Sequence, residues 1–204
     1  MNQYQVIYAD PPWEYGAWSK RGNGTAEKHY KTMGAADIAA LPVSSVAADN
    51  CALFLWATMP TLPQAISLME SWGFAYKTAA FTWIKTTKPK TAHPRGLPYI
   101  VNGYNDQGDT LKSRPAFGTG HYTRANAEIC LLGIRGRMPV ADRSVEQVIV
   151  SPRGEHSGKP PEARERIERL YPSVTRLEMF ARAPADGWDV WGNEVDCDLD
   201  LVAT

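Results

Sequence analysis

The chain has 204 residues, with 22 Lys or Arg and 22 Asp or Glu, so its formal net charge at pH 7 is zero. The length predicts one domain over residues 1–204, and 44% hydrophobic residues is ordinary for a globular protein. The zero net charge argues against nucleic-acid binding through overall electrostatics. No apolar run approaches the roughly 18 residues of a membrane span, and the first ten residues lack the pattern of a secretion signal. We therefore expect a cytoplasmic protein without membrane association.

The sequence does not indicate a metal site, a disulfide framework or a binding motif for several common cofactors. Cys51, Cys130 and Cys197 are odd in number and lack zinc-binding spacing; the first two lie in apolar segments and are expected in the core. The four histidines also lack ligand spacing, so no metal site is predicted. There is no dinucleotide fingerprint, Walker loop or nucleophile elbow, which argues against NAD enzymes, nucleotide hydrolases and serine hydrolases.

Apolar periodicity predicts an alternation of strands and helices. The strands are expected at 4–9, 51–57, 75–84, 127–134, 146–151 and 174–180, and the helices at 34–41, 61–72 and 160–170. Such alternation predicts an α/β fold with a mostly parallel sheet and helices on both faces. In such sheets ligands bind beyond the carboxyl ends of the strands, so residues that follow a strand are candidates for the site.

The tetrapeptide Asp10-Pro11-Pro12-Trp13 directly follows the first predicted strand. Because the two prolines forbid the strand from continuing, the chain is expected to turn abruptly and expose a carboxylate and a large aromatic ring. The alternative is a proline-rich turn with a surface tryptophan. The same pattern, placed at a ligand-binding edge, favours a catalytic motif.

These four residues suit methyl transfer to an aromatic amine. The exocyclic amine of adenine is a poor nucleophile because its lone pair is delocalised into the ring. Asp10 can accept one proton of that amine, and the carbonyl of Pro11, held by fixed φ angles, can accept the other. Trp13 can stack on a base taken out of its helix. We therefore predict Asp10, Pro11, Pro12 and Trp13 as the catalytic residues, with no metal required.

The segment at about 86–118 is predicted as a long loop. Residues 85–124 contain seven Lys or Arg and two Asp, whereas residues 186–200 contain six acids and no base. A loop of this length is a functional lid or a disordered stretch, and its charge favours a lid that contacts a polyanion. The predicted substrate-binding residues are Trp13 of the tetrapeptide, Tyr15 just after it, and four cations of the loop, Lys88, Lys90, Arg95 and Arg114.

Three further features lie late in the chain. Lys159 directly precedes the helix predicted at 160–170, where a lysine can hold a carboxylate with help from the helix dipole; a solvated lysine is the alternative. Residues 178–182 end the last predicted strand. Asn193 and Glu194 belong to a tight turn that suits ribose hydroxyls and a purine edge.

Taken together and in this order, the motifs resemble the DPPW-type adenine-N6 methyltransferases, a family that includes the catalytic subunit of the eukaryotic messenger-RNA adenosine methyltransferase. The resemblance runs nearly end to end, and the short form looks most like phage and prophage members. The segments that carry it are Asp10–Trp13, His29–Met33, Leu53–Trp56, Trp72–Phe74, Trp83–Lys85, Gly118–Arg124, His156–Pro160, Ile167–Leu170, Glu178–Arg182 and Trp191–Glu194.

The resemblance implies S-adenosylmethionine as methyl donor and a Rossmann-like methyltransferase fold in permuted order, with the catalytic motif first. It implies that Asp10 touches both the methionine end of the cofactor and the target amine, and that Lys159 holds the methionine carboxylate. The remaining cofactor contacts that it implies, around the adenosine and its ribose, come from Phe180, Arg182, Asn193 and Glu194.

The resemblance also implies a nucleic-acid substrate. The phage-like form favours N6 methylation of adenine in DNA, in the cytoplasm of a bacterial or phage-infected host cell. The same reaction on RNA and a non-catalytic nucleic-acid-binding scaffold are the alternatives. Apart from the loop at 86–118 the chain shows no separate target-recognition domain, which leaves open a homodimer or a partner subunit.

Overall fold

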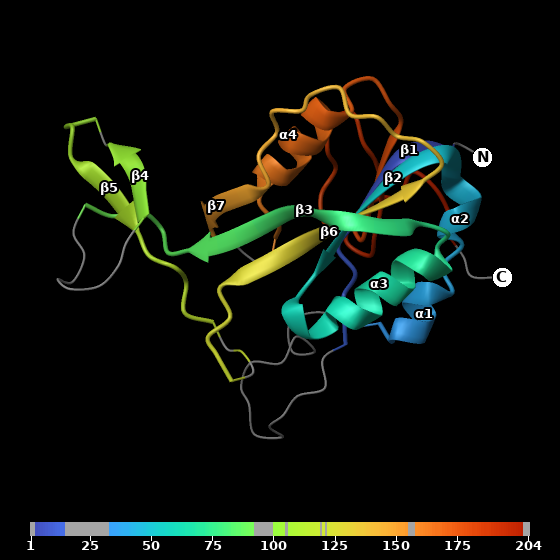
Figure 1. Ribbon diagram of the computed structural model, residues 1–204, viewed down its shortest axis with the longest axis horizontal. Coiled ribbons are helices and arrows are strands. Elements are labelled where there is room, and N and C mark those ends of the chain that lie inside the picture. The colour runs from blue at the N-terminus through green and yellow to red at the C-terminus, as the bar shows by residue number, and fades with distance from the viewer. Residues whose placement is uncertain are drawn as a thin grey trace.

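The computed structural model describes residues 3–14, 33–91, 100–104, 106–118, 120, 122–154 and 158–201. Its body is a seven-stranded sheet in the order β7-β3-β6-β2-β1-β8-β9 (Figure 1). β6 runs antiparallel to its neighbours β2 and β3, and the other four strand pairs are parallel. The strands are β1 (Tyr4–Ala9), β2 (Ala47–Ala57), β3 (Ala75–Thr86), β6 (Ala127–Arg135), β7 (Val148–Pro152), β8 (Arg176–Met179) and β9 (Asp189–Trp191).

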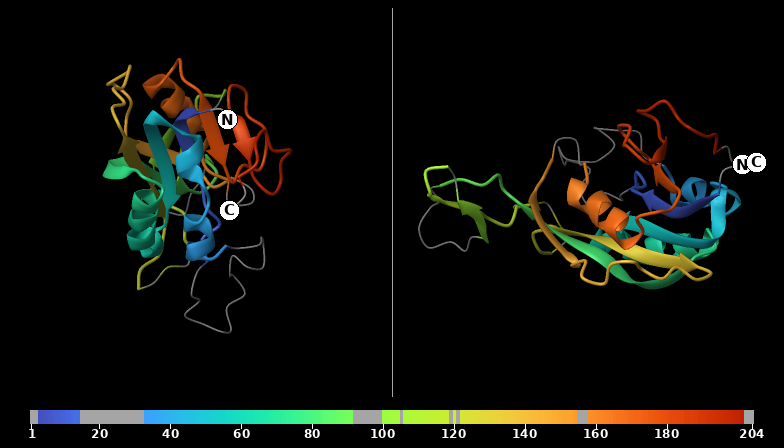
Figure 2. Two further views of the ribbon diagram at one scale, coloured as in Figure 1. Left: turned by 90° about the vertical axis from the view of Figure 1, so that its right-hand side faces the viewer. Right: turned by 90° about the horizontal axis from the view of Figure 1, so that it is seen from above.

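Helices cover both faces of this sheet, as Figure 2 shows. One face packs against α1 (Ala35–Ala39), α2 (Val43–Val46) and α3 (Leu62–Ser71), and the short 3₁₀ helix η2 (Met59–Thr61) leads into α3. The other face packs against α4 (Pro161–Leu170). Alternation along β1 divides the core: Ile7 faces the first group of helices, whereas Val6 and Tyr8 face α4. The predicted α/β, Rossmann-like fold is confirmed.

The six predicted strands and three predicted helices are all present: β1 has the predicted bounds, and the other elements have shifted ends. β2 begins at Ala47, four residues before the predicted start, and β8 ends at Met179 rather than at residue 180. Phe180 leaves the strand in a left-handed conformation, with φ 61°. Such a backbone is unfavourable for a side chain with a Cβ and commonly marks a functional turn.

The prediction of a loop without secondary structure at 86–118 is wrong. β4 (Ile100–Tyr104) and β5 (Thr110–Ser113) pair as an antiparallel hairpin, which extends from the end of β3 away from the main sheet (Figure 1). The segment after β3 runs antiparallel to the other edge of β5 and forms the stem of this hairpin, where the backbones of Lys90 and Lys112 exchange two hydrogen bonds of 2.9 Å. The sequence hid the hairpin because its strands are short and their register shifts between Val101 and Gly103.

In the part of the chain that the structure describes, no helix is long and apolar enough to cross a membrane. The same residues contain no group of three or more His, Cys, Asp or Glu side chains arranged to hold a metal ion.

Candidate active site

Three strand ends meet at one edge of the sheet. Ala9 of β1 is in register with Met179 of β8, which is in register with Trp191 of β9. The residues that follow these three, namely Asp10, Phe180 and Gly192, therefore lie side by side beyond the carboxyl ends of parallel strands. This register brings together the motifs near the two ends of the sequence.

A chain of alternating charges begins at Asp10. The Lys159 ammonium donates to the Asp10 carboxylate at 2.6 Å and lies 3.3 Å from the second oxygen of Glu128. The other oxygen of Glu128 accepts from the ammonium of Lys85. The cluster Asp10–Lys159–Glu128–Lys85 thus contains two acids and two bases in a mostly buried setting, where pairing offsets the cost of removing each charge from water.

The titration of these groups reflects their mutual contacts. Burial would lower the pKa of Lys159, but the carboxylates of Asp10 and Glu128 outweigh it and raise that pKa. Burial would raise the pKa of Glu128, but the ammonium groups of Lys159 and Lys85 together bring it below its usual value. For Asp10, burial raises the pKa more than Lys159 lowers it, and the Glu128 carboxylate raises it further. Lys159 therefore remains protonated, and as the pH falls Asp10 takes up a proton before Glu128 does.

The prolines form a tight turn at the end of β1. The carbonyl of Pro11 accepts the backbone N–H of Trp13 at 2.8 Å, which spans Pro12 in the manner of an inverse γ-turn. A carbonyl oxygen has two lone pairs, so Pro11 keeps acceptor capacity for a second donor. The turn is anchored because Met33 donates its backbone N–H to Pro12.

The prediction that the ring of Trp13 is exposed is wrong. Trp13 is only 6% exposed, and its indole N–H donates to the backbone carbonyl of Trp56 at 3.1 Å. The indole of Trp56 in turn donates to the hydroxyl of Tyr8 at 2.7 Å. The hydrophobic effect and this hydrogen bond turn the ring inward, so a base could stack on it only after the turn had moved.

The other predicted cofactor residues surround the ends of β8 and β9. The rings of Phe180 and Trp191 contact edge to face, with centroids 5.3 Å apart. Arg182 lies 3.9 Å from the carboxylate of Glu194, and Asn193 is exposed beside it in the same turn. Between these residues the chain passes very close to itself: a Cβ at Gly192 would lie 2.2 Å from the Ala181 carbonyl oxygen, so this position requires glycine.

The donors and acceptors at this edge fit S-adenosylmethionine. Lys159 has three N–H donors, of which Asp10 and Glu128 occupy two, so one suits the methionine carboxylate. Asp10 offers a carboxylate to the cationic end of the methionine moiety. Asn193 and Glu194 offer polar groups to ribose hydroxyls.

The predicted substrate-binding residues take up different positions. Lys88 and Lys90 follow β3, and Arg114 follows β5, where its carbonyl accepts the Thr87 N–H at 2.8 Å. These cations lie along the stem of the hairpin. Tyr15 and Arg95 lie outside the described residues.

Glu128 is the main residue of the site that sequence reasoning missed. It follows Ala127 in β6 and precedes Ile129 and Cys130, and its side chain is 14% exposed. A single acid in such an apolar strand is a usable signal, because a buried carboxylate needs a partner. The partners, Lys85 and Lys159, lie too far away in the sequence for any local pattern to identify them.

Comparison with known proteins agrees with this geometry. The profile of the MT-A70 family matches residues 4–98 and 103–194. The chain is 33% identical to the Type II methyltransferase M.MunI of Mycoplasma sp over 211 residues, covering 95% of this chain and 78% of that protein. It is also 29% identical to a probable N(6)-adenosine-methyltransferase MT-A70-like protein of Oryza sativa and 26% identical to the N(6)-adenosine-methyltransferase catalytic subunit METTL3 of Homo sapiens.

The alignment with the two eukaryotic proteins covers 96% and 100% of this chain but only 24% and 31% of theirs. The match therefore concerns the part of each that corresponds to the fold described above. Methyltransferases of the MT-A70 type use S-adenosylmethionine as methyl donor, in line with the donor and acceptor groups at the strand ends. The family match over nearly the whole chain, together with the alignment to M.MunI, establishes that this protein belongs to the MT-A70 family of methyltransferases.

Proposed function

We propose that this chain transfers a methyl group from S-adenosylmethionine to the exocyclic N6 amine of adenine in DNA. The observation that carries the proposal is the paired Asp10 and Lys159 at the carboxyl end of β1, in a cluster that Glu128 completes. This arrangement provides an acceptor for an amine proton and a cation for a carboxylate within one hydrogen bond of each other. A protein that only binds nucleic acid has no need for such a pair in a mostly buried position.

In this proposal Asp10 and Pro11 prepare the amine. The Asp10 carboxylate accepts one N–H of the adenine amine, and the free lone pair of the Pro11 carbonyl accepts the other. Two acceptors draw the nitrogen from planar towards tetrahedral geometry and localise its lone pair for attack. When bound, S-adenosylmethionine supplies an electrophilic methyl group on its sulfonium. As the new N–C bond formed, the bond between the methyl group and the sulfonium sulfur would break, and S-adenosylhomocysteine would be the leaving group. Asp10 would then take the proton that the nitrogen loses.

Lys159 and the turns after β8 and β9 hold the cofactor in this proposal. The third N–H of Lys159 binds the methionine carboxylate, and Glu128 keeps the ammonium in place while it does so. Asn193 and Glu194 bind the ribose, with Arg182 beside Glu194. Phe180, which has a left-handed backbone and whose ring contacts Trp191, packs near the adenosine.

DNA is favoured over RNA by two observations. The short form of the sequence resembles phage and prophage members of the family. The bacterial Type II methyltransferase also aligns over more of its own length, at higher identity, than the eukaryotic adenosine methyltransferases. RNA is the second candidate substrate, on the strength of the relatives named as N(6)-adenosine methyltransferases.

The stem of the β4–β5 hairpin supports a polyanionic substrate. Lys90 and Lys112 are directly opposed in a hydrogen-bonded antiparallel pair, so their side chains emerge on the same face. A phosphate backbone passing over the stem would meet both side chains, and Lys88 and Arg114 extend the basic surface.

Incubation with labelled S-adenosylmethionine and either DNA or RNA, followed by mass spectrometry of the nucleosides, tests the proposal. N6-methyladenine from the DNA reaction is the expected product. Label found only in RNA would establish the second candidate, and no label in either polymer would leave a scaffold role.

A further inference from the structure

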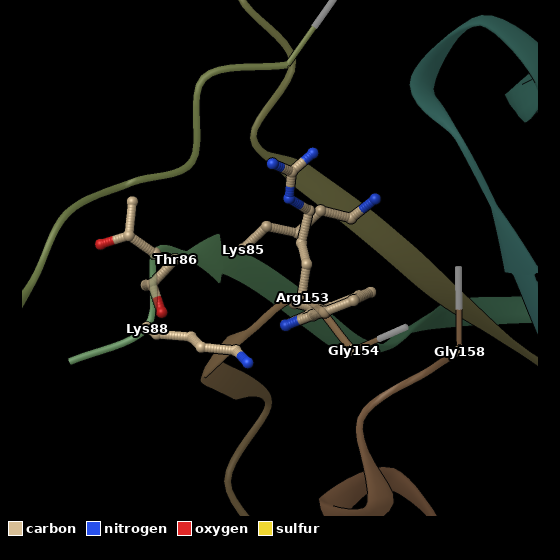
Figure 3. Close-up of a pocket in the computed structure, with 8 residues that line it drawn as sticks. Lys85, Thr86, Lys88, Arg153, Gly154 and Gly158 are labelled. Atoms are coloured by element: carbon tan, nitrogen blue, oxygen red, sulfur yellow. The ribbon is translucent and has the colours of Figure 1, made fainter. Parts of the chain in front are cut away.

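A pocket of about 410 Å³ opens beside the charged cluster, where β3 and β7 end and the chain approaches α4 (Figure 3). The cationic side chains that line it are Lys85, Lys88 and Arg153. Gly154 and Gly158 form part of the wall of the pocket. A Cβ at Gly154 would meet no atom nearer than 3.9 Å, so there is open space beside this residue. The sequence assigned no role to Arg153.

The charge of the pocket is positive. Lys85 is paired with Glu128, so its charge is compensated. Lys88 and Arg153 form no ion pair with any residue that the structure describes, and no described acid lines the pocket. An arginine fork and a lysine ammonium on an open pocket match the oxygens of a phosphate.

Thr86 provides an independent indication of a ligand. This residue lines the same pocket and is only 2% exposed, yet its hydroxyl has no hydrogen-bond partner among the described residues. A buried hydroxyl without a partner is costly, and an oxygen of a bound ligand would satisfy it once the Thr86 side chain turned to bring the hydroxyl to the pocket wall. The backbone N–H of Arg153 donates to the carbonyl of Thr86, which fixes the two residues beside each other.

The pocket is continuous with the proposed methyl-transfer site. Lys85 forms its inner wall and also ends the charged cluster that begins at Asp10. A strand whose adenine amine lies at Asp10 would therefore carry its own backbone over the pocket and on towards Lys88 at the hairpin stem. One phosphate close to the target nucleotide would meet Arg153 there.

We propose that this pocket is a phosphate subsite, in which Arg153 binds one backbone phosphate of the nucleic-acid strand next to the target adenosine, while Lys88 and Thr86, on the other side of the pocket, contact the backbone beyond it (Figure 3). The inference rests on the proposed function. It adds a contact that fixes the strand relative to Asp10, and so predicts a specific phosphate whose charge matters more than that of its neighbours.

The test removes the charge of Arg153 and the charge of single phosphates, first separately and then together. In a DNA substrate that the protein methylates, phosphates around the target adenine are replaced one at a time by uncharged methylphosphonates. One replacement within two nucleotides of the adenine should lower kcat/KM of the wild-type enzyme roughly tenfold, as expected for one charge-assisted contact. In Arg153→Gln that same replacement should change kcat/KM less than about twofold, because the partner charge is already gone.

Lys77→Gln serves as the matched control, because Lys77 is an exposed lysine in the same strand as Lys85 but far from the end that forms the pocket. It should respond to the methylphosphonates as the wild type does. Thr86→Val removes the unpartnered hydroxyl at nearly constant volume. It should weaken substrate binding roughly threefold to tenfold without lowering thermal stability, since no protein partner is lost.

Two results would contradict the proposed phosphate subsite. A methylphosphonate effect that persists unchanged in Arg153→Gln overturns the subsite. So does an Arg153→Gln variant that binds inorganic phosphate less tightly but oligonucleotides as before, which would assign the pocket to free phosphate.

A binding assay separates this inference from the proposed function, because it needs no turnover. If the proposed function fails, Arg153→Gln should still flatten the salt dependence of oligonucleotide affinity by about 0.7 to 0.9 in log–log slope. An unchanged slope overturns the subsite whatever the reaction.

Discussion

The ammonium of Lys159 lies 2.6 Å from the carboxylate of Asp10, although 149 residues separate them in the sequence. Asp10 follows β1, and Lys159 precedes α4, whose Ala163 and Ile167 pack against the β1 side chains Val6 and Tyr8. The packing of α4 on the sheet thus sets the position of the ion pair. This couples the stability of the fold to the geometry of the site.

Lys159→Met should weaken S-adenosylhomocysteine binding by roughly tenfold or more, because a charged hydrogen-bond donor to the carboxylate is lost. Calorimetry measures this affinity directly. Asn193→Ala should weaken it by a smaller factor, and Lys77→Met should leave it unchanged. Nucleic-acid affinity should fall less than cofactor affinity in the first two variants. Unchanged affinity for S-adenosylhomocysteine in both would place the cofactor elsewhere.

Glu128→Gln should shift the pH dependence of the reaction. The Glu128 carboxylate raises the pKa of Asp10, so its removal should lower that pKa, and Lys159 then pairs with Asp10 alone, which acts in the same direction. Activity needs ionised Asp10, so it is lost as the pH falls through that pKa. The acidic limb of kcat/KM for S-adenosylmethionine, which reports the free enzyme, should therefore move to lower pH. A limb that stays in place, or moves upward, contradicts this description of the cluster.

Trp13→Phe should lower stability, because it leaves the buried carbonyl of Trp56 without its indole donor. The expected cost is about 1–3 kcal/mol, or roughly 2–4 °C in Tm for each kcal/mol in a chain of this size. Trp72→Phe is a matched control, since the indole of Trp72 donates in the same way to the Ile38 carbonyl on the face covered by α1 and α3. Both variants should lose stability, and Trp13→Phe alone should lower kcat. A Trp13→Phe protein with wild-type Tm but a raised KM for nucleic acid would instead support a stacking role.

Lys90→Gln should affect binding and leave folding unchanged. Lys90 pairs with Lys112 through backbone groups, which glutamine keeps, so the Tm should stay the same. It should also weaken oligonucleotide binding and flatten the log–log salt dependence by about 0.7 to 0.9. Fluorescence anisotropy over a salt series measures both. A lower Tm with an unchanged slope would mean that Lys90 serves the hairpin and not the substrate.

The sequence predicted the sheet well because the central strands carry strong local signals. Leu53, Phe54 and Leu55 are fully buried between two helical layers, which produces the continuous apolar run that marks a central strand. β9 was missed because three residues are too few for any periodicity. The hairpin was missed because neither of its strands exceeds five residues.

The site was predicted in its residues more than in its geometry. Asp10 and Lys159 stood out because each follows or precedes a clear element, and parallel strands bring such positions to one edge. The inward rotation of Trp13 could not be read from the sequence, because it depends on a carbonyl of Trp56, 43 residues away. The role of Glu128 depends on two lysines from β3 and the segment before α4, which only the folded chain brings together.

The most direct test of the central claim compares the wild type with Asp10→Asn in methylation of DNA. Asparagine keeps the size of the side chain but replaces one acceptor oxygen by an amide that cannot take a proton. Removal of one preorganised group of this kind typically costs on the order of a hundredfold in rate or more. With both proteins folded at the assay temperature, as shown by circular dichroism, the wild type should yield N6-methyladenine by nucleoside mass spectrometry and Asp10→Asn at least about a hundredfold less per unit time. Near-wild-type turnover by Asp10→Asn, or label on a base other than adenine, would contradict the mechanism.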